Sequence, residues 1–216
     1  GTGGDGRKVQ CPNQSRLGTA IPALLKLIDI RGAIITIDAM GTQTAIAQDI
    51  IGGGGDYLLA LKGNQETLHQ AVVKRIDEEM QHNFSRGKAR RHVTRETGHG
   101  RDEVRHYIQM PVPKDLPGRD RWPNLLTIGV AMLSCLRAGK ETAEIRYFIS
   151  SLPLGVKRFA HAIRSHWAIE NTCHWSLDVT YREDDSRIRD AHVRENFAWL
   201  NRFTLSLLKQ HKNKKS

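Results

Sequence analysis

The chain has 216 residues, a formal net charge of +10 and an apolar content of 39%. This length fits one large domain or two small ones, and it is sufficient to bury a substantial core. No apolar run reaches the roughly 18 residues of a membrane helix, so we expect no integral membrane protein. The glycine-rich start lacks the apolar region of a signal peptide.

The cysteines and the charge narrow the class of protein further. Cys11, Cys135 and Cys173 are widely spaced and form no Cys-x-x-Cys pair, which argues against a disulfide scaffold and a zinc knuckle. A reduced, cytoplasmic setting is therefore expected. The positive charge is typical of proteins that bind a polyanion such as nucleic acid, although many soluble proteins are basic without doing so.

The first third of the chain alternates helices with short buried strands. The pattern predicts helices over 20–29, with Pro22 in the first turn, and over 41–51, and strands over 33–37 and 57–61. Asn64 is placed to cap a further helix that runs to about His82. This order is typical of a parallel sheet with helical crossovers, so the fold class is α/β.

The middle of the chain is strongly basic and reads as an antiparallel β insertion over about 84–152. Strands are predicted over 91–95, 103–109, 125–134 and 144–151, with prolines between them.

The pattern returns to helix after Pro153. One apolar face then combines Val156, Ala160, Ile163 and Trp167. A last helix is expected over about 190–209, and its apolar residues are Val193, Phe197, Leu200 and Leu207.

Two carboxylates are candidates for chemistry. Asp38 follows a predicted strand at its carboxyl end, where ligands gather in open α/β sheets, although it would also suit a turn or a helix cap. Glu170 falls on the apolar stripe of its helix, where a carboxylate needs a metal ion or a base as partner. The alternative is that the helix ends there and Glu170 lies in solvent.

Three other motifs carry less weight. His166 and His174 flank Glu170, but they are eight residues apart, about 12 Å on a helix, which is too far for one zinc ion. The glycine run 52–55 precedes a strand and lacks the ending of a phosphate loop. The acidic run 183–185 is typical of a solvated turn.

Basic and histidine residues are concentrated between Arg86 and His106. Such clusters hold phosphate backbones, although a solvated hairpin is the simpler alternative. Carboxylates on separate elements beside a basic surface suggest phosphodiester chemistry that depends on Mg²⁺.

Several short motifs stand out: IITIDAMGTQ at 34–43, GGDYLLALKGNQ at 54–65, GHGR at 98–101, YFISS at 147–151, IRSHWAIEN at 163–171, HWSLDV at 174–179 and EDDSR at 183–187. Together they resemble a bacterial insertion-sequence DDE transposase, of the group that includes the H-repeat-associated proteins. The match covers nearly all of residues 19–210, in order and spacing.

The resemblance implies a ribonuclease H-like core with the β insertion placed before the glutamate helix. Asp38 and Glu170 would be catalytic and would bind two Mg²⁺ or Mn²⁺ ions in an intact site. The partners would be DNA, as insertion-sequence ends and target, and a second copy of the chain as a homodimer. The expected DNA contacts are Lys62, Asn64, Arg101, Arg105, Arg164, His166, Arg187 and Arg189. Trp167 would suit either DNA or the core, and its periodicity favours the core.

The chain also departs from the family pattern. The family's first catalytic Asp would lie upstream of Asp38, so we expect a truncated copy that lacks the first strands of the core and is inactive alone. Positions that hold Tyr, Arg and Lys in related transposases are Ile163, His166 and Leu177 here. The expected division is a loosely matched start (1–18), a catalytic domain (19–210) and a basic tail (211–216).

Two other functions therefore stay open. One is a DNA-binding remnant without catalysis. The other is a stand-alone metal-dependent nuclease, in which Asp178 or Asp184 would replace the missing carboxylate.

Overall fold

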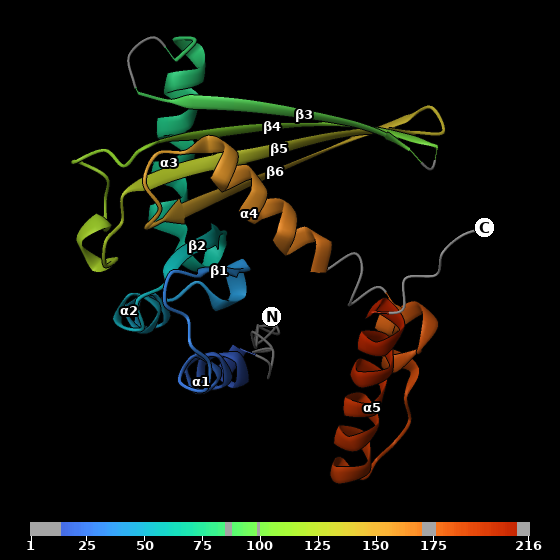
Figure 1. Cartoon of the computed structure of the whole chain (residues 1–216). Coiled ribbons are helices and arrows are strands. Elements are labelled where there is room, and N and C mark those ends of the chain that lie inside the picture. Colours follow the sequence, from blue (N-terminus) through green and yellow to red (C-terminus); the bar gives the residue numbers. More distant parts are fainter. Residues whose placement is uncertain (1–13, 85–87, 99, 170–175, 211–216) are drawn as a thin grey trace, which may run out of the picture. The chain divides into compact units, whose positions relative to one another are not determined.

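The computed structural model describes residues 14–84, 88–98, 100–169 and 176–210 (Figure 1). The chain divides into two units, residues 1–162 and residues 163–216. Helix α4 (Val156–Ile169) begins in the first unit and ends in the second.

The strand–helix–strand–helix order predicted for the first part of the chain is confirmed. Strands β1 (Ile34–Ile37) and β2 (Asp56–Leu61) are parallel neighbours. Helix α2 (Thr44–Gly52) connects them, and helix α3 (Glu66–Gln81) follows β2. Parallel strands cannot be joined by a tight turn, so α2 and its flanking turns supply the necessary crossover.

Helix α1 (Gln14–Leu25) lies earlier in the chain than the sequence predicted, and Pro22 is in its second half instead of its first turn. Proline costs the helix one backbone donor, yet the Lys26 N–H still donates to the Pro22 carbonyl at 3.3 Å. The buried side chain of Leu25 lies in this last part of the helix. The helix therefore continues past the proline and ends just beyond it.

The four strands predicted for the middle of the chain are confirmed, and each extends further toward its hairpin tip than expected. They are β3 (Arg90–Gly98), β4 (Arg101–Pro111), β5 (Thr127–Arg137) and β6 (Lys140–Ser150). The sequence pattern underestimated the length of β3 to β6 at the hairpin tips. Both faces are largely solvent-exposed there, so the strands carry no apolar alternation.

All of these strands belong to one sheet. Among the described residues it has six strands in the order β1-β2-β6-β5-β4-β3. Strand β6 returns antiparallel beside β2, with Leu59 opposite Ile149, and both side chains are fully buried. The β insertion therefore extends the sheet of β1 and β2 instead of forming a separate layer.

Helix α3 and the first turns of α4 (156–162) lie on opposite faces of this sheet (Figure 1). His69 of α3 meets Tyr147 edge to face at 5.4 Å, and Phe159 of α4 meets Phe148 in the same way at 5.7 Å. Tyr147 and Phe148 are consecutive on β6, so their side chains point to opposite faces. The first turns of α4 therefore lie on the Phe148 face, and α3 lies on the Tyr147 face.

The second unit contains the end of α4, a short π-helix (Ser176–Thr180) and helix α5 (Ala191–Gln210). The predicted apolar stripe of α4 is confirmed, since Ala160, Ile163 and Trp167 are all buried. The apolar residues predicted on one side of α5 are largely exposed, among them Leu200 at 57%. In the described residues no helix combines the length and the apolar character that a membrane crossing requires.

Candidate functional site

Asp38 directly follows β1, at the edge where β1 and β2 both end. It is half-buried and begins a short 3-10 turn, Ala39–Gly41, but its side chain makes no capping hydrogen bond. No described residue pairs with the Asp38 carboxylate. The cap that the sequence left open as an alternative is therefore not formed, and the carboxylate is available to a ligand.

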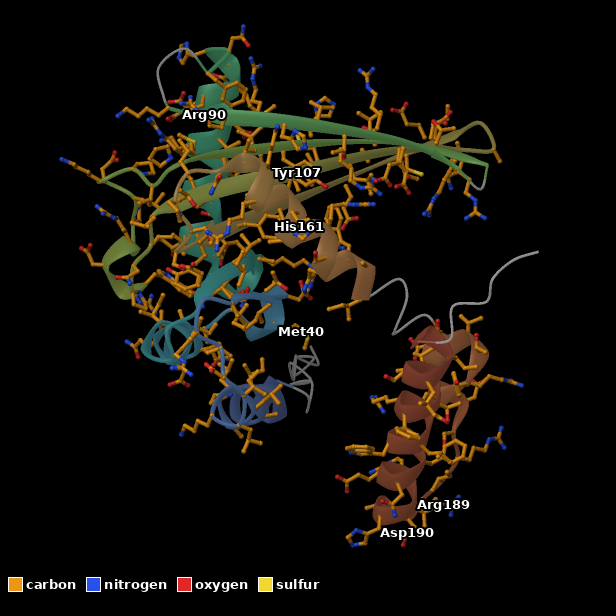
Figure 2. All side chains as sticks on the ribbon, in the orientation of Figure 1. Met40, Arg90, Tyr107, His161, Arg189 and Asp190 are labelled. Atoms are coloured by element: carbon orange, nitrogen blue, oxygen red, sulfur yellow. The ribbon has the colours of Figure 1, made fainter. Side chains whose placement is uncertain are left out.

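The turn after Asp38 is fixed from the second strand. Thr42 is fully buried, and its hydroxyl donates to the Ala60 carbonyl of β2 at 2.6 Å. The Asn64 amide donates to the Ala39 carbonyl, and the Gln65 amide donates to the Thr42 carbonyl at 3.1 Å. Met40, labelled in Figure 2, lies in the same turn and stays exposed. These bonds preorganise the backbone that carries Asp38.

The sequence was wrong about Asn64 as a helix cap. Helix α3 begins at Glu66 with Gln65 in the capping position, and no side chain caps it. Asn64 lies in a 3-10 turn, Gly63–Gln65, and its amide is used to hold the Asp38 turn. This contact favours a positioning role over the DNA contact expected from the sequence. Lys62, directly after β2, is exposed and available to solvent.

Glu170 and His174 lie outside the described residues, which reach Ile169 at the end of α4. The second predicted catalytic carboxylate is therefore not placed against Asp38. No group of three or more potential metal ligands occurs among the described His, Cys, Asp and Glu residues.

The basic residues of β3 and β4 have different environments in the sheet. Arg105 is buried, with ion pairs to Glu103 on its own strand and to Glu96 on β3. A guanidinium held by two carboxylates in the sheet favours a structural role over the phosphate contact expected for it. Arg101 pairs with Glu103 at 3.1 Å, yet half of its side chain is exposed.

The remaining expected DNA contacts fall in the second unit. Arg164 and His166 are half-buried on α4, while Arg187 and Arg189 are exposed between the acidic run and α5. Trp167 is buried, as the core interpretation predicted.

The acidic run forms a 3-10 turn, as expected, and the carboxylates of Glu183 and Asp185 form ion pairs. Glu183 pairs with Arg202 of α5 at 3.0 Å, and Asp185 pairs with Arg182 at 2.9 Å. These pairs tie the turn to its own unit, so they indicate a structural role. Asp178, one of the alternative carboxylates, is exposed on the π-helix.

Two clefts that the sequence did not predict lie along α3. One, of about 670 Å³, is lined by Asn64, Gln65 and Glu66 on one side and by Gly118 and Arg121 on the other. Asn64 and Gln65, which bond to the turn after Asp38, therefore share this cleft with Arg121, a residue for which the sequence gave no signal. Tyr57 holds the segment that follows Arg121, because its hydroxyl donates to the Pro123 carbonyl at 2.9 Å. Burial raises the pKa of this phenol.

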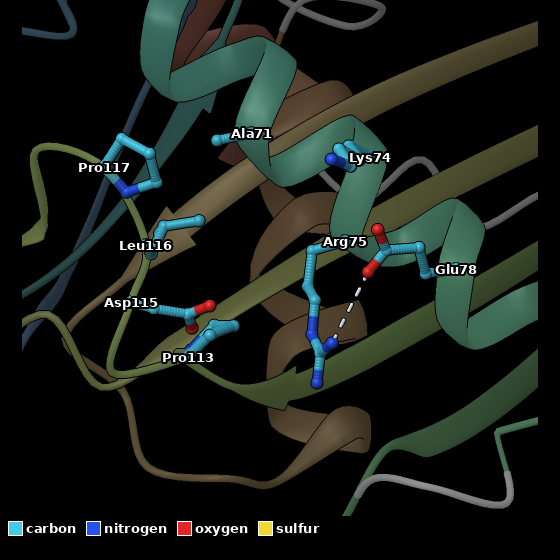
Figure 3. A pocket seen from close by; sticks show the side chains of 8 residues that line it. All are labelled: Ala71, Lys74, Arg75, Glu78, Pro113, Asp115, Leu116 and Pro117. Carbon is cyan, nitrogen blue, oxygen red and sulfur yellow. Dashed lines mark ion pairs between the residues drawn. The ribbon is translucent and has the colours of Figure 1, made fainter.

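The second cleft is smaller, about 210 Å³, and carries charges of both signs (Figure 3). Arg75 and Glu78 of α3 pair across its wall at 3.5 Å, and Asp115 faces them from the loop after β4. Since its charges balance, this cleft has no preference for a polyanion.

A parallel strand pair that ends in an available aspartate, with a basic β insertion after it, is what the resemblance implied. The sequence profile described as "Transposase DDE domain" matches residues 8–208 of the chain. The chain belongs to the DDE transposase family. The mixed α/β fold with its six-stranded sheet agrees with this membership.

Relatives of this family member come from Escherichia coli. "Putative transposase YncI" of strain O157:H7 is 41% identical over 199 residues, which are 90% of this chain and 50% of the relative. "H repeat-associated putative transposase YhhI" of strain K12 is 38% identical over 210 residues, which are 95% of this chain and 55% of the relative. The chain thus spans about half the length of these curated relatives, and the predicted H-repeat-associated group is confirmed. No solved structure matches the chain.

Proposed function

We propose that this chain carries the catalytic part of a DNA transposase that cuts and rejoins phosphodiester bonds at the ends of an insertion sequence. The observation that carries the proposal is the half-buried Asp38 carboxylate, unpaired among the described residues, at the shared end of β1 and β2. A partly exposed carboxylate without a described protein partner has oxygens that are available to a cation. Membership of the DDE family gives that cation a chemical purpose.

The donor at Asp38 fits Mg²⁺ or Mn²⁺, because these hard cations prefer carboxylate oxygens. Asp38 would bind the metal together with Glu170, which the resemblance names as its partner. Divalent ions in such sites lower the pKa of the attacking group and stabilise the leaving oxygen. Thr42, Asn64 and Gln65 would act as positioning residues, since their hydrogen bonds fix the turn that presents the carboxylate.

The fold and partners of the intact enzyme follow from the same proposal. Strands β1 and β2 with α2 would form part of a ribonuclease H-like core, extended on one side by β3 to β6. DNA would be the substrate, in the bacterial cytoplasm, with a homodimer as the working assembly. Lys62 and Arg101 are exposed and suited to contact the backbone, as are Arg187 and Arg189 in the second unit. Arg164 and His166 stay proposed contacts on α4.

The test compares Asp38→Asn with Asp49→Asn, the same change at an exposed aspartate of α2. Two measurements are made on each purified chain: nicking of supercoiled plasmid in Mn²⁺, and Mn²⁺ binding followed by electron paramagnetic resonance. We expect Asp38→Asn to weaken Mn²⁺ binding at least tenfold, because the amide lacks the negative charge. Any nicking by the unmodified chain, which the expected truncation would reduce or remove, should be abolished in this variant. Asp49→Asn should leave both unchanged.

Two other outcomes decide against catalysis at Asp38. DNA binding without nicking in the unmodified chain would support a non-catalytic DNA-binding remnant. Nicking that survives Asp38→Asn but disappears in Asp178→Asn or Asp184→Asn would support a stand-alone nuclease. Circular dichroism of each variant excludes unfolding as the cause of a loss.

A further inference from the structure

The alternation of side chains along β3 to β6 sorts the charges of these strands onto two unlike faces. Residues directly opposite one another on paired strands share a face. The face that carries Phe148 also carries six Lys and Arg residues and three acids: Arg90, Arg101, Arg105, Arg137, Lys140, Arg146, Glu96, Glu103 and Glu144. The face that carries Tyr147 has two of each, Arg91, Arg95, Asp102 and Glu141. One face is therefore cationic and the other neutral.

The helices on the two faces differ in charge in the same way as the faces themselves. Helix α4, whose Phe159 packs against Phe148, contains no Asp or Glu in its described span and exposes Lys157 and Arg158. Helix α3, on the Tyr147 face, has four acids and only Lys74 and Arg75 as bases. The Phe148 side of this unit thus attracts anions, while the other side does not.

The strongest feature of the cationic face is a row of three cations at the hairpin tip. Arg101 of β4 is directly opposite Arg137 of β5, and Arg137 is directly opposite Lys140 of β6. All three side chains are exposed, and Arg137 and Lys140 have no ion pair with any described residue. Like charges in opposite positions destabilise a sheet. A bound anion would remove that repulsion.

The backbone holds this tip row in place. Ala138 and Gly139 both have positive φ, 49° and 76°, and they join β5 to β6 in a two-residue turn. Such turns match the twist of the strands and make a hairpin tight. On β3, Gly98 is the partner of Arg101 and adds no side chain to the row. The tight turn therefore preorganises the tip row, and no described residue of β3 adds a side chain to it.

The tip row also lies at a defined place relative to Asp38. Strands β1 and β2 end, and β6 begins, at the same end of the sheet. Ile37 pairs with Leu59, and Leu59 with Ile149, which follows Lys140 by nine residues on β6. At about 3.3 Å per residue, the tip row extends roughly 30 Å beyond the Asp38 edge. One turn of duplex DNA is about 34 Å long.

We propose that the tip row binds the phosphate backbone of duplex DNA. The contact would lie about one helical turn from the phosphodiester bond that is to be cut at the Asp38 edge. This rests on DNA as the substrate of the proposed function, and it adds Arg137 and Lys140 to the expected contacts. The sheet then acts as an arm that orients the duplex, while the reaction takes place at the Asp38 edge. Contacts of this kind carry no base sequence, so they position DNA of any sequence.

The experiment compares two variants of the full chain with the same change of charge. Arg137→Gln with Lys140→Gln removes one Arg and one Lys from the tip row. The control, Arg95→Gln with Lys74→Gln, removes one Arg and one Lys from the Tyr147 side of the same unit. Binding of a fluorescein-labelled 30-base-pair duplex is measured by anisotropy from about 50 to 200 mM NaCl, with thermal melting as the check on folding.

Each lost phosphate contact reduces the slope of log Kd against log salt by about one. We expect the tip variant to lose about two from this slope and roughly tenfold or more in affinity, with the control close to the unmodified chain. Equal slopes in the two variants would overturn the inference and leave DNA binding intact. Absence of binding by the unmodified chain at 50 mM NaCl would overturn the proposed function together with the inference.

Discussion

At the scale of single residues, the turn after β1 is held by individual hydrogen bonds, and the bond of Thr42 is the clearest example near Asp38. Thr42 is fully buried four residues after Asp38, and its hydroxyl is the donor that reaches across to β2. A buried hydroxyl must find a partner, because an unpaired polar group in the interior costs free energy. The sequence shows an ordinary threonine in a turn, so only the fold identifies its role.

Thr42→Val tests this bond. The methyl group replaces the hydroxyl at nearly equal volume and leaves the Ala60 carbonyl without its donor. We expect the free energy of unfolding to fall by about 1–3 kcal/mol, measured by urea denaturation. Thr97→Val, at an exposed position of β3, is the control and should change it by less than about 0.5 kcal/mol. A Thr42→Val chain as stable as the control would show that the bond is not formed.

At the scale of elements, the contact of α4 with the sheet depends on a glycine. Gly129 of β5 lies under Phe159, and an added Cβ would come within 2.6 Å of the Phe159 ring and 2.8 Å of the Ile108 carbonyl oxygen. Only a residue without a side chain allows the ring to approach so closely. This contact therefore determines how closely the first turns of α4 pack on the sheet.

Gly129→Ala is expected to destabilise the chain by about 1–3 kcal/mol, because the extra methyl overpacks the contact. Gly98→Ala is the matched control, since a Cβ there meets no atom within 4 Å and its φ is not positive. Thermal melting measures both. If the two alanine variants melt at the same temperature, α4 does not pack on Gly129 as described.

For the whole molecule, the net charge of +10 has a thermodynamic cost. Repulsion among like charges destabilises a compact chain, and salt screens it over a Debye length of about 10 Å at 0.1 M. In the proposed function the same charge would attract DNA, and salt would weaken that attraction. Salt should therefore act in opposite directions on folding and on DNA binding.

We expect the melting temperature at pH 7 to rise between about 20 and 300 mM NaCl in the absence of DNA. Near the isoelectric point of 9.8 the net charge vanishes and most of this rise should disappear. Differential scanning calorimetry at the two pH values measures the effect. A rise of equal size at both would mean that salt stabilises the chain by a route other than screening.

Local sequence patterns were sufficient to predict many elements of this protein. Apolar runs such as Ile34–Ile37 predicted strands, although this one is half-buried instead of buried. The stripe through Ile163 and Trp167 predicted a buried helix face, and Asp38 could be placed at the end of a strand. These features depend on residues close together in the chain, where hydrophobic periodicity is informative. The family resemblance rested on the same short motifs, and the profile match confirms it.

Other features were decided only by tertiary structure. Asn64 holds the Asp38 turn through a bond between residues 25 apart in sequence, so its pattern as a helix cap was misleading. Arg101 and Arg105 look equivalent in the sequence, yet strand pairing buries Arg105 between two acids and leaves Arg101 exposed in the tip row. The physical reason is that the register of the strands decides which face each charged side chain lies on and which side chains it contacts. The exposure of a charge therefore cannot be predicted from its place in the sequence.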